Sequence, residues 1–515
     1  MTSGSGHPSS PSGAWAADPA YPSYPTQPTY PAQTYPAQTY PGQTYPTQTY
    51  PAQTYPAQTY PAQTSPGQPT YPAWPPPPPA WALPPQPKRS WRRWLLGTLA
   101  VVLVCCVGGA GALVGYASAT GAFDSHARWI SGEAGQHPPA ADASVADWRL
   151  WVFRAAGEVL VARGAAVAAG DEAAFLAPLD PGNAKLISEE TRRFRVLRQM
   201  GAGVYRESVT GTPEDLGQRS WRLDTDMFYC FGPATCSVVR LPIRTEWSFR
   251  SDGLRIAAVV SSAAEWNGPR PWEVADLQVR TGNRVVLAAT KSNAWRLADA
   301  VRSADSAALV ADTFAKWHEP PSRYVIFLAG PNEWKTWYGH EQPDWAAAWA
   351  VPVGNLTTEV VVRTDSVRQS TLQGLLSHEL THVTSLAGDR SGLTRNTWWL
   401  VEGIADYAEF LGKPVRLYDA LAPTRTYVHG SWDGDIAVSA PGSDASVDEA
   451  AAHYGVAFLA VRRIAERYGQ EKMIKFFGAV VHEDKSLETA ASSTLGASWA
   501  SVSTDCAKFV RSSVG

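Results

Sequence analysis

The chain has 515 residues and a formal net charge of −3 at pH 7, with 22 tryptophans and five cysteines. This length leaves room for two or three domains, and the balanced charge excludes the strongly basic surface that is typical of nucleic-acid binding. So many tryptophans are useful only in a folded core or at a lipid interface. We therefore expect a folded protein without a nucleic-acid partner.

Residues 1–90 are of low complexity, with the motif Tyr-Pro-x-Gln-Thr recurring every five residues from Tyr30 to Tyr60. A proline at every fifth position prevents helices and sheets, and too few aliphatic side chains are present to form a core. We expect a disordered cytoplasmic arm with polyproline II character. The arm either binds partners through its repeats or is a solvated tether.

Residues 91–120 contain an apolar run from Trp94 to Tyr116, preceded by four basic residues between positions 88 and 93. The run is long enough to cross a hydrocarbon core of about 30 Å as a helix. The basic cluster predicts a cytoplasmic N-terminus, which makes the chain a single-pass type II membrane protein. A cleaved signal peptide is the alternative, because Ala117-Ser118-Ala119 is typical of a cleavage site. Residues 121–145 are expected to form a short stalk.

Residues 146–290 read as helices followed by an antiparallel sheet, which predicts an α+β module. Helical spacing covers Trp148–Ala169 and continues after Gly170. The expected strands are Trp221–Tyr229, Ser237–Ile243, Arg244–Phe249, Leu254–Val260 and Val274–Ala289. The run Ala-Gly-Asp-x-x-Ala-Phe-Leu-x-x-Leu-Asp from Ala169 to Asp180 resembles the opening of the NTF2-like fold. This resemblance implies ligand binding, dimerisation or a spacer role, and we expect a spacer or docking module because no set of acids and bases is present.

Cys230 and Cys236 bracket the short segment Phe-Gly-Pro-Ala-Thr, which is typical of a tight turn. In an oxidising compartment these cysteines can form a disulfide. The alternative is a pair of buried thiols. Cys506 is left without a partner in either case.

Residues 291–515 begin with a predicted helix over Ala294–Trp317 and a buried strand over Tyr324–Ala329. Further strands are expected over Trp345–Val353 and Thr358–Arg363, the latter at the edge of the sheet because its residues alternate. A long helix is predicted from Glu449 to Tyr468.

Two stretches in this last region carry the candidate chemistry. His378-Glu379-Leu380-Thr381-His382 follows helical apolar spacing, so His378 and His382 lie on one face of a helix. The run from Trp398 to Tyr407 supplies a carboxylate, Glu402. Two histidines and one glutamate leave a fourth coordination position open, which is typical of a catalytic zinc site.

The two stretches together resemble the gluzincin metallopeptidases, with His-Glu-x-x-His followed by Trp-Leu-x-Glu-Gly-x-Ala-x-Tyr. The resemblance implies that His378, His382 and Glu402 bind Zn²⁺ and that Glu379 is the general base. It also implies a substrate-binding sheet edge, for which Thr358–Val362 is the candidate. Asp406, one turn after Glu402, either orients a ligand histidine or is a solvated acid.

A peptide oxyanion needs a hydrogen-bond donor besides the metal, and related peptidases take a Tyr or His from a later helix. Tyr454 is our candidate, with His453 second. The alternative is that Tyr454 packs in the core.

The interpretation of the whole chain is an α+β zinc metallopeptidase, anchored in the cell membrane with its catalytic domain outside the cytoplasm. Its partners are then a peptide or protein substrate, the membrane and any ligand of the Pro-rich arm. The first alternative is a non-catalytic zinc-binding or sensory ectodomain coupled to that arm. The second is an interaction scaffold.

Overall fold

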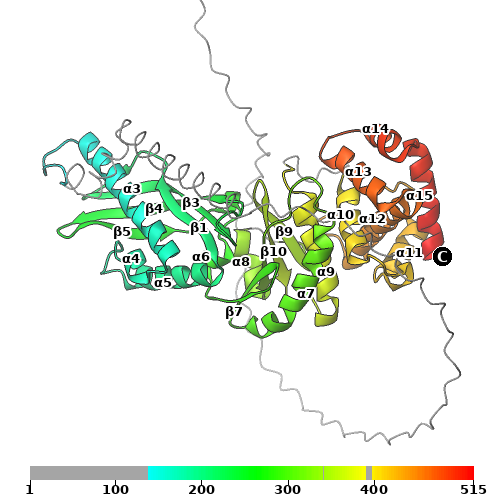
Figure 1. Cartoon of the computed structure of the whole chain (residues 1–515), viewed down its shortest axis with the longest axis horizontal. Coiled ribbons are helices and arrows are strands. Elements are labelled where there is room, and N and C mark those ends of the chain that lie inside the picture. The colour runs from blue at the N-terminus through cyan, green and yellow to red at the C-terminus, as the bar shows by residue number, and fades with distance from the viewer. Residues whose placement is uncertain (1–136, 340–341, 390–396) are drawn as a thin grey trace, which may run out of the picture. The chain divides into compact units, whose positions relative to one another are not determined.

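The computed structural model describes residues 137–339, 342–389 and 397–515. The predicted arm, the transmembrane helix and most of the stalk lie outside the described residues. Among the helices in these ranges, none is both long and apolar enough to cross a membrane. The described chain is a mixed α+β structure with two sheets, as the sequence predicted (Figure 1).

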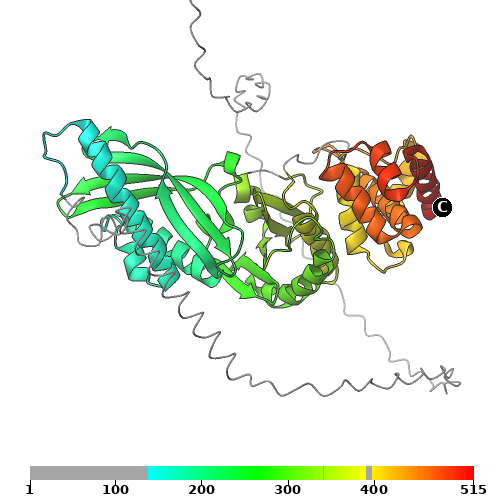
Figure 2. The same ribbon diagram turned by 45° about the horizontal axis from the view of Figure 1, so that its top comes forward.

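The first sheet follows three helices, and all of its strand pairs are antiparallel, in the order β1-β3-β4-β5 with β2 on β3. The helices are α3 (Val145–Ala169), α4 (Glu172–Leu176) and α5 (Ala184–Gln199). The strands are β1 (Ala202–Val209), β2 (Glu214–Gly217), β3 (Ser220–Phe231), β4 (Val239–Arg250) and β5 (Gly253–Val260). Helix α3 packs across the sheet (Figure 2). Trp148 of this helix stacks on Trp221 of β3.

The second sheet has the order β6-β7-β8-β10-β9 and mixes parallel and antiparallel pairs. Strands β7, β8 and β10 run parallel, while β6 and β9 are antiparallel to their neighbours. The strands are β6 (Leu277–Thr281), β7 (Val285–Thr290), β8 (Tyr324–Ala329), β9 (Ala348–Gly354) and β10 (Thr357–Arg363). The accompanying helices are α6 (Pro271–Val274), α7 (Leu297–Asp312) and α8 (Pro331–Thr336).

Three strand predictions need correction. The single strand expected over Val274–Ala289 is the β6–β7 hairpin, because the Asp305 carboxylate accepts hydrogen bonds from the turn amides of Asn283 and Arg284 at 3.0 and 2.8 Å. This hairpin belongs to the second sheet, so the predicted boundary at residue 290 does not separate the two sheets. The two strands expected over Ser237–Phe249 are the one strand β4, since pairing with β3 is continuous.

The third correction concerns the sheet edge beside the candidate site. The sequence predicted that Thr358–Val362 is an edge, but β10 is paired on both sides, with β8 and with β9. Beside β10, the edge strand of the sheet is β9, as far as the described residues show. An alternating pattern indicates one polar and one apolar face and does not report how many neighbours a strand has.

The two sheets share a hydrophobic core, which includes Tyr229 of β3, Val286 of β7 and Phe327 of β8. A buried carboxylate also joins them. Glu359 of β10 accepts hydrogen bonds from the hydroxyls of Tyr229, at 3.0 Å, and of Tyr338, at 2.6 Å. Burial raises the pKa of Glu359. The first sheet is therefore packed into the same structural unit as the second.

Helices make up most of the chain after β10. They are α9 (Gln369–Ser385), α10 (Trp398–Glu409), α11 (Leu421–Gly430), α12 (Val447–Tyr468), α13 (Gln470–Val481), α14 (Leu487–Ala490) and α15 (Trp499–Val514). Short 3₁₀ or π segments occur at Ala264–Trp266, Ala294–Arg296, Trp337–Gly339, Val415–Leu417 and Ala491–Leu495. Helices α10 and α12 approach closely at Gly403, where a Cβ atom would lie 2.6 Å from the carbonyl oxygen of Ala457.

The cysteine predictions are confirmed. Cys230 and Cys236 form a disulfide with their Cα atoms 6.0 Å apart, and Cys506 is a buried free thiol.

Candidate metal centre

Helix α9 carries the first two candidate ligands. Its apolar residues Leu372, Leu376 and Leu380 are buried in one core that also contains residues of α7. This packing fixes the rotation of the helix about its axis. His378 and His382, four residues apart, then point the same way, and their side chains are 8 % and 9 % exposed.

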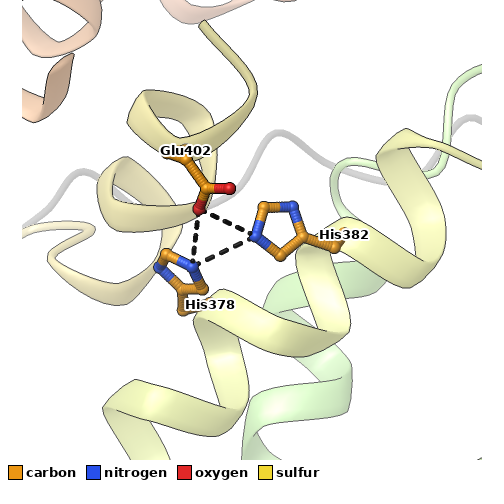
Figure 3. A group of neighbouring side chains, drawn as sticks. All are labelled: His378, His382 and Glu402. Carbon is orange, nitrogen blue, oxygen red and sulfur yellow. Dashed lines mark hydrogen bonds and ion pairs between the residues drawn. The ribbon is translucent and has the colours of Figure 1, made fainter. Parts of the chain in front are cut away.

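Helix α10 brings the third ligand to the same point. The three atoms His378 Nε2, His382 Nε2 and Glu402 Oε2 lie 3.1, 3.2 and 3.2 Å apart, an almost equilateral triangle (Figure 3). Tetrahedral zinc with ligands at about 2.0–2.1 Å requires about 3.3 Å between ligand atoms. The separations therefore fit a divalent ion of this size, and the group could hold a metal ion.

Hydrogen bonding also favours a cation at this point. The Nδ1 atom of His378 lies 2.8 Å from Asp406 Oδ1, which makes Nδ1 the donor and turns the lone pair of Nε2 toward Glu402. Glu402 Oε2 is buried without a hydrogen-bond donor within the described residues. Lone pairs that converge in a buried site repel each other unless a positive charge lies between them.

The carboxylates around His378 also favour positive charge at this point. Burial acts to lower the pKa of His378, but the carboxylates of Asp406 and Glu402 outweigh it and raise that pKa well above its usual range. Burial acts to raise the pKa of Glu402, but the two imidazoles outweigh it and lower that pKa. The carboxylates thus create a site that attracts positive charge.

Asp406 is held from two sides. Its Oδ1 faces His378, and its Oδ2 accepts a hydrogen bond from the hydroxyl of Tyr418 at 2.6 Å. The contact between Asp406 and His378 is the one that the sequence suggested. Tyr418 was missed, because it lies in a loop-like segment twelve residues after Asp406 and no spacing rule connects them.

Glu379 lies beside the triangle and faces a cavity of about 340 Å³. Its side chain is buried, and burial raises its pKa against the opposing effect of the two imidazoles. The free-edge strand β9 forms one wall of the same cavity through Ala348, Trp349 and Ala350. A buried carboxylate, three atoms that could hold a metal ion and the edge strand β9 therefore meet in one cavity.

The two donor candidates on α12 differ in position. Tyr454 lines the cavity, with its ring centroid 6.1 Å from that of His378. Burial raises the pKa of Tyr454 well above its usual range, so its hydroxyl stays protonated, and this hydroxyl donates a hydrogen bond to the Glu402 carboxylate. His453 is turned elsewhere, with Nδ1 2.8 Å from the carbonyl oxygen of Ser439, and it does not line this cavity.

No family model matches the chain, and no curated protein matches it. The fold and the site define the class of this protein. It is an α+β protein with a buried group of two histidines and one glutamate that could hold a metal ion.

Proposed function

We propose that this chain is a zinc-dependent metallopeptidase of the gluzincin type, which hydrolyses peptide bonds outside the cytoplasmic membrane. The observation that supports it most is the convergence of His378, His382 and Glu402 beside a general base, Glu379. All four side chains line one cavity whose wall is the edge strand β9. A purely structural metal site would have no need of the cavity, the base or the open strand edge.

Zinc in such a site is a Lewis acid that lowers the pKa of a water molecule toward about 7. Glu379 takes a proton from the attacking water and delivers it to the leaving amine. The raised pKa of Glu379 suits both transfers, because its proton affinity is closer to that of the groups it serves. Asp406 and Tyr418 hold the ring of His378 in the orientation that binding requires.

The strand edge and Tyr454 position the substrate. The free edge of β9 offers backbone N–H and C=O groups to an extended peptide, which then adds to the sheet as a further strand. The hydroxyl of Tyr454 donates to the oxygen of the scissile carbonyl as negative charge develops on it.

The test measures metal content and turnover on the same samples. The full-length chain is purified, its metal is quantified, and a casein digest and a peptide library are followed with and without chelator. We expect about one zinc per chain and cleavage that chelator removes and zinc restores. Bound zinc without turnover would instead favour a non-catalytic zinc-binding ectodomain.

A further inference from the structure

A second cavity, of about 380 Å³, adjoins the metal centre and is not used by the chemistry above. It meets the first cavity at Trp345, Glu379 and Tyr454, which line both. A peptide that follows β9 past Glu379 therefore has a place for one of its side chains in this second cavity.

The walls of the second cavity are mostly small and apolar. They include Ala346, Ala347 and Ala450, with Leu375 and Phe410 beside them. Such walls suit an unbranched aliphatic stem, because they offer contact area without polar groups that need partners.

The far side of the cavity is acidic. Among the described residues, its lining contains Asp406, Glu409 and Asp419 in addition to Glu379. His378 is the basic residue of this lining, which contains no Lys or Arg. Asp406 is occupied by His378 and Tyr418. Glu409 is half-buried. Burial and the Asp406 carboxylate raise the pKa of Glu409 to about 7, against the opposing effect of His378 and Lys413. The nearby Lys413 lies against the ring of Phe410, with Nζ 4.7 Å from the centroid, and is not part of the lining.

Two further observations show a space kept open for these carboxylates. A Cβ atom on Gly374 of α9 would lie 2.7 Å from Glu409 Oε1, so glycine at this position leaves room for the carboxylate. Glu379, only 5 % exposed, also faces the cavity without a hydrogen-bond partner in the described chain. A buried carboxylate without a partner favours a cationic ligand.

We propose that this second cavity is a specificity site for a basic substrate residue, lysine or arginine, whose charged end pairs with Glu409 and Asp419. The proposal rests on the proposed peptidase function and names its substrate class. A free peptide N-terminus is a poorer fit, because it has no aliphatic stem to fill the apolar walls.

The first test reads cleavage sites from a peptide-library digest by the full-length chain. We expect lysine and arginine to be enriched about tenfold or more over leucine and methionine at one position next to the cleaved bond. Glu409→Gln, which keeps the shape and removes the charge, should abolish the enrichment while cleavage continues. Glu409→Lys should shift the preference to aspartate and glutamate. Asp419→Asn, at an exposed position that tolerates change, should reduce the enrichment by about two- to threefold.

The matched control is Glu466→Gln on α12, since Glu466 pairs with Arg462 away from both cavities. It should leave the enrichment unchanged. An unchanged lysine and arginine preference in Glu409→Gln, or enrichment of free N-termini instead, would overturn the proposal.

A second test separates this proposal from the peptidase function. Binding of Nα-acetyl-lysine methylamide and Nα-acetyl-norleucine methylamide to the full-length chain is measured by ligand-observed NMR. We expect the lysine compound to bind about tenfold or more tightly, and Glu409→Gln to equalise the two. If no peptide is cleaved, the peptidase proposal fails. The ratio of the two binding affinities then tests by itself whether the second cavity selects a basic side chain. Equal binding to the unaltered chain rejects the specificity site.

Discussion

Two groups of buried ionisable side chains in this molecule are stabilised in different ways. In the first cluster, the Arg163 guanidinium of α3 donates hydrogen bonds to Glu207 of β1, at 2.9 and 3.0 Å, and to Glu190 of α5. The opposite charges of these side chains neutralise each other. At the candidate metal centre, the nitrogen and oxygen atoms of His378, His382 and Glu402 converge on one point, and no Lys or Arg is among the described residues that line the cavity there. The first cluster is complete without a ligand, whereas the second favours a bound cation. The contrast separates a structural role from a functional one.

The largest expected effect comes from removing a charge at the metal centre. Glu402→Gln keeps the volume and removes the anionic ligand, so we expect zinc stoichiometry to fall from about one to near zero and cleavage to be lost. Stabilisation of the fold by added zinc should vanish as well, because that stabilisation requires binding to the native state. Metal analysis and thermal melts check this outcome.

Glu379→Gln is the matched comparison for that variant. It should keep zinc and lose cleavage by at least about a thousandfold, since the base acts in both proton transfers. Glu471→Gln, at an exposed position on α13 paired with Lys475, should change neither property. Retained turnover in Glu379→Gln would reject the mechanism.

A glutamate-to-glutamine change in the Arg163 cluster should lower the stability of the fold without changing metal binding. Glu207→Gln leaves Arg163 partly unpaired in a buried site, so we expect the free energy of unfolding to fall by about 3–5 kcal/mol. Chemical denaturation measures the loss. Zinc stoichiometry of the folded fraction should stay near one, and a loss of zinc would show that the two clusters are coupled.

A smaller effect is expected from the hydroxyl of Tyr454. Tyr454→Phe should lower kcat by about a hundredfold to a thousandfold with little change in zinc content, because one oxyanion donor is removed. Tyr468→Phe, at the end of the same helix, provides the control. If kcat is unchanged in Tyr454→Phe, its ring has only a packing role against Trp398.

The smallest effects concern the support of His378. Asp406→Asn should weaken zinc affinity by about 10- to 100-fold, and Tyr418→Phe should weaken it less, because Tyr418 acts only through Asp406. Competition with a zinc chelator of known affinity measures both. Asp299→Asn on α7 serves as control, since its partner is Arg302 on the protein surface. A larger effect in Tyr418→Phe than in Asp406→Asn would contradict this order.

Local patterns were enough to predict several features of the site. The four-residue spacing of His378 and His382 places them on one helical face whatever the rest of the chain does. Apolar periodicity located α9, α10 and α12, and the short Cys230–Cys236 loop indicated the disulfide. Each of these predictions depends on residues that are close in the sequence.

The predictions that were wrong or missing depend on contacts between distant segments. Whether β10 or β9 is the sheet edge depends on which strands pair, and the pattern within Thr358–Val362 carries no information on that. The β6–β7 hairpin joins the second sheet through its pairing with β8. His453 was a reasonable second donor by its position in the chain, but the rotation of α12 turns it toward Ser439.

The sequence by itself determined which residues could bind a metal and which helix would carry them, because helical geometry relates neighbours at fixed spacing. Only the tertiary structure decided that Glu402 meets the two histidines, that Tyr418 supports Asp406 and that Glu409 faces a cavity beside Glu379. These contacts follow from the packing of α9, α10 and the Tyr418 segment against one another. Packing brings together residues that no local sequence pattern connects.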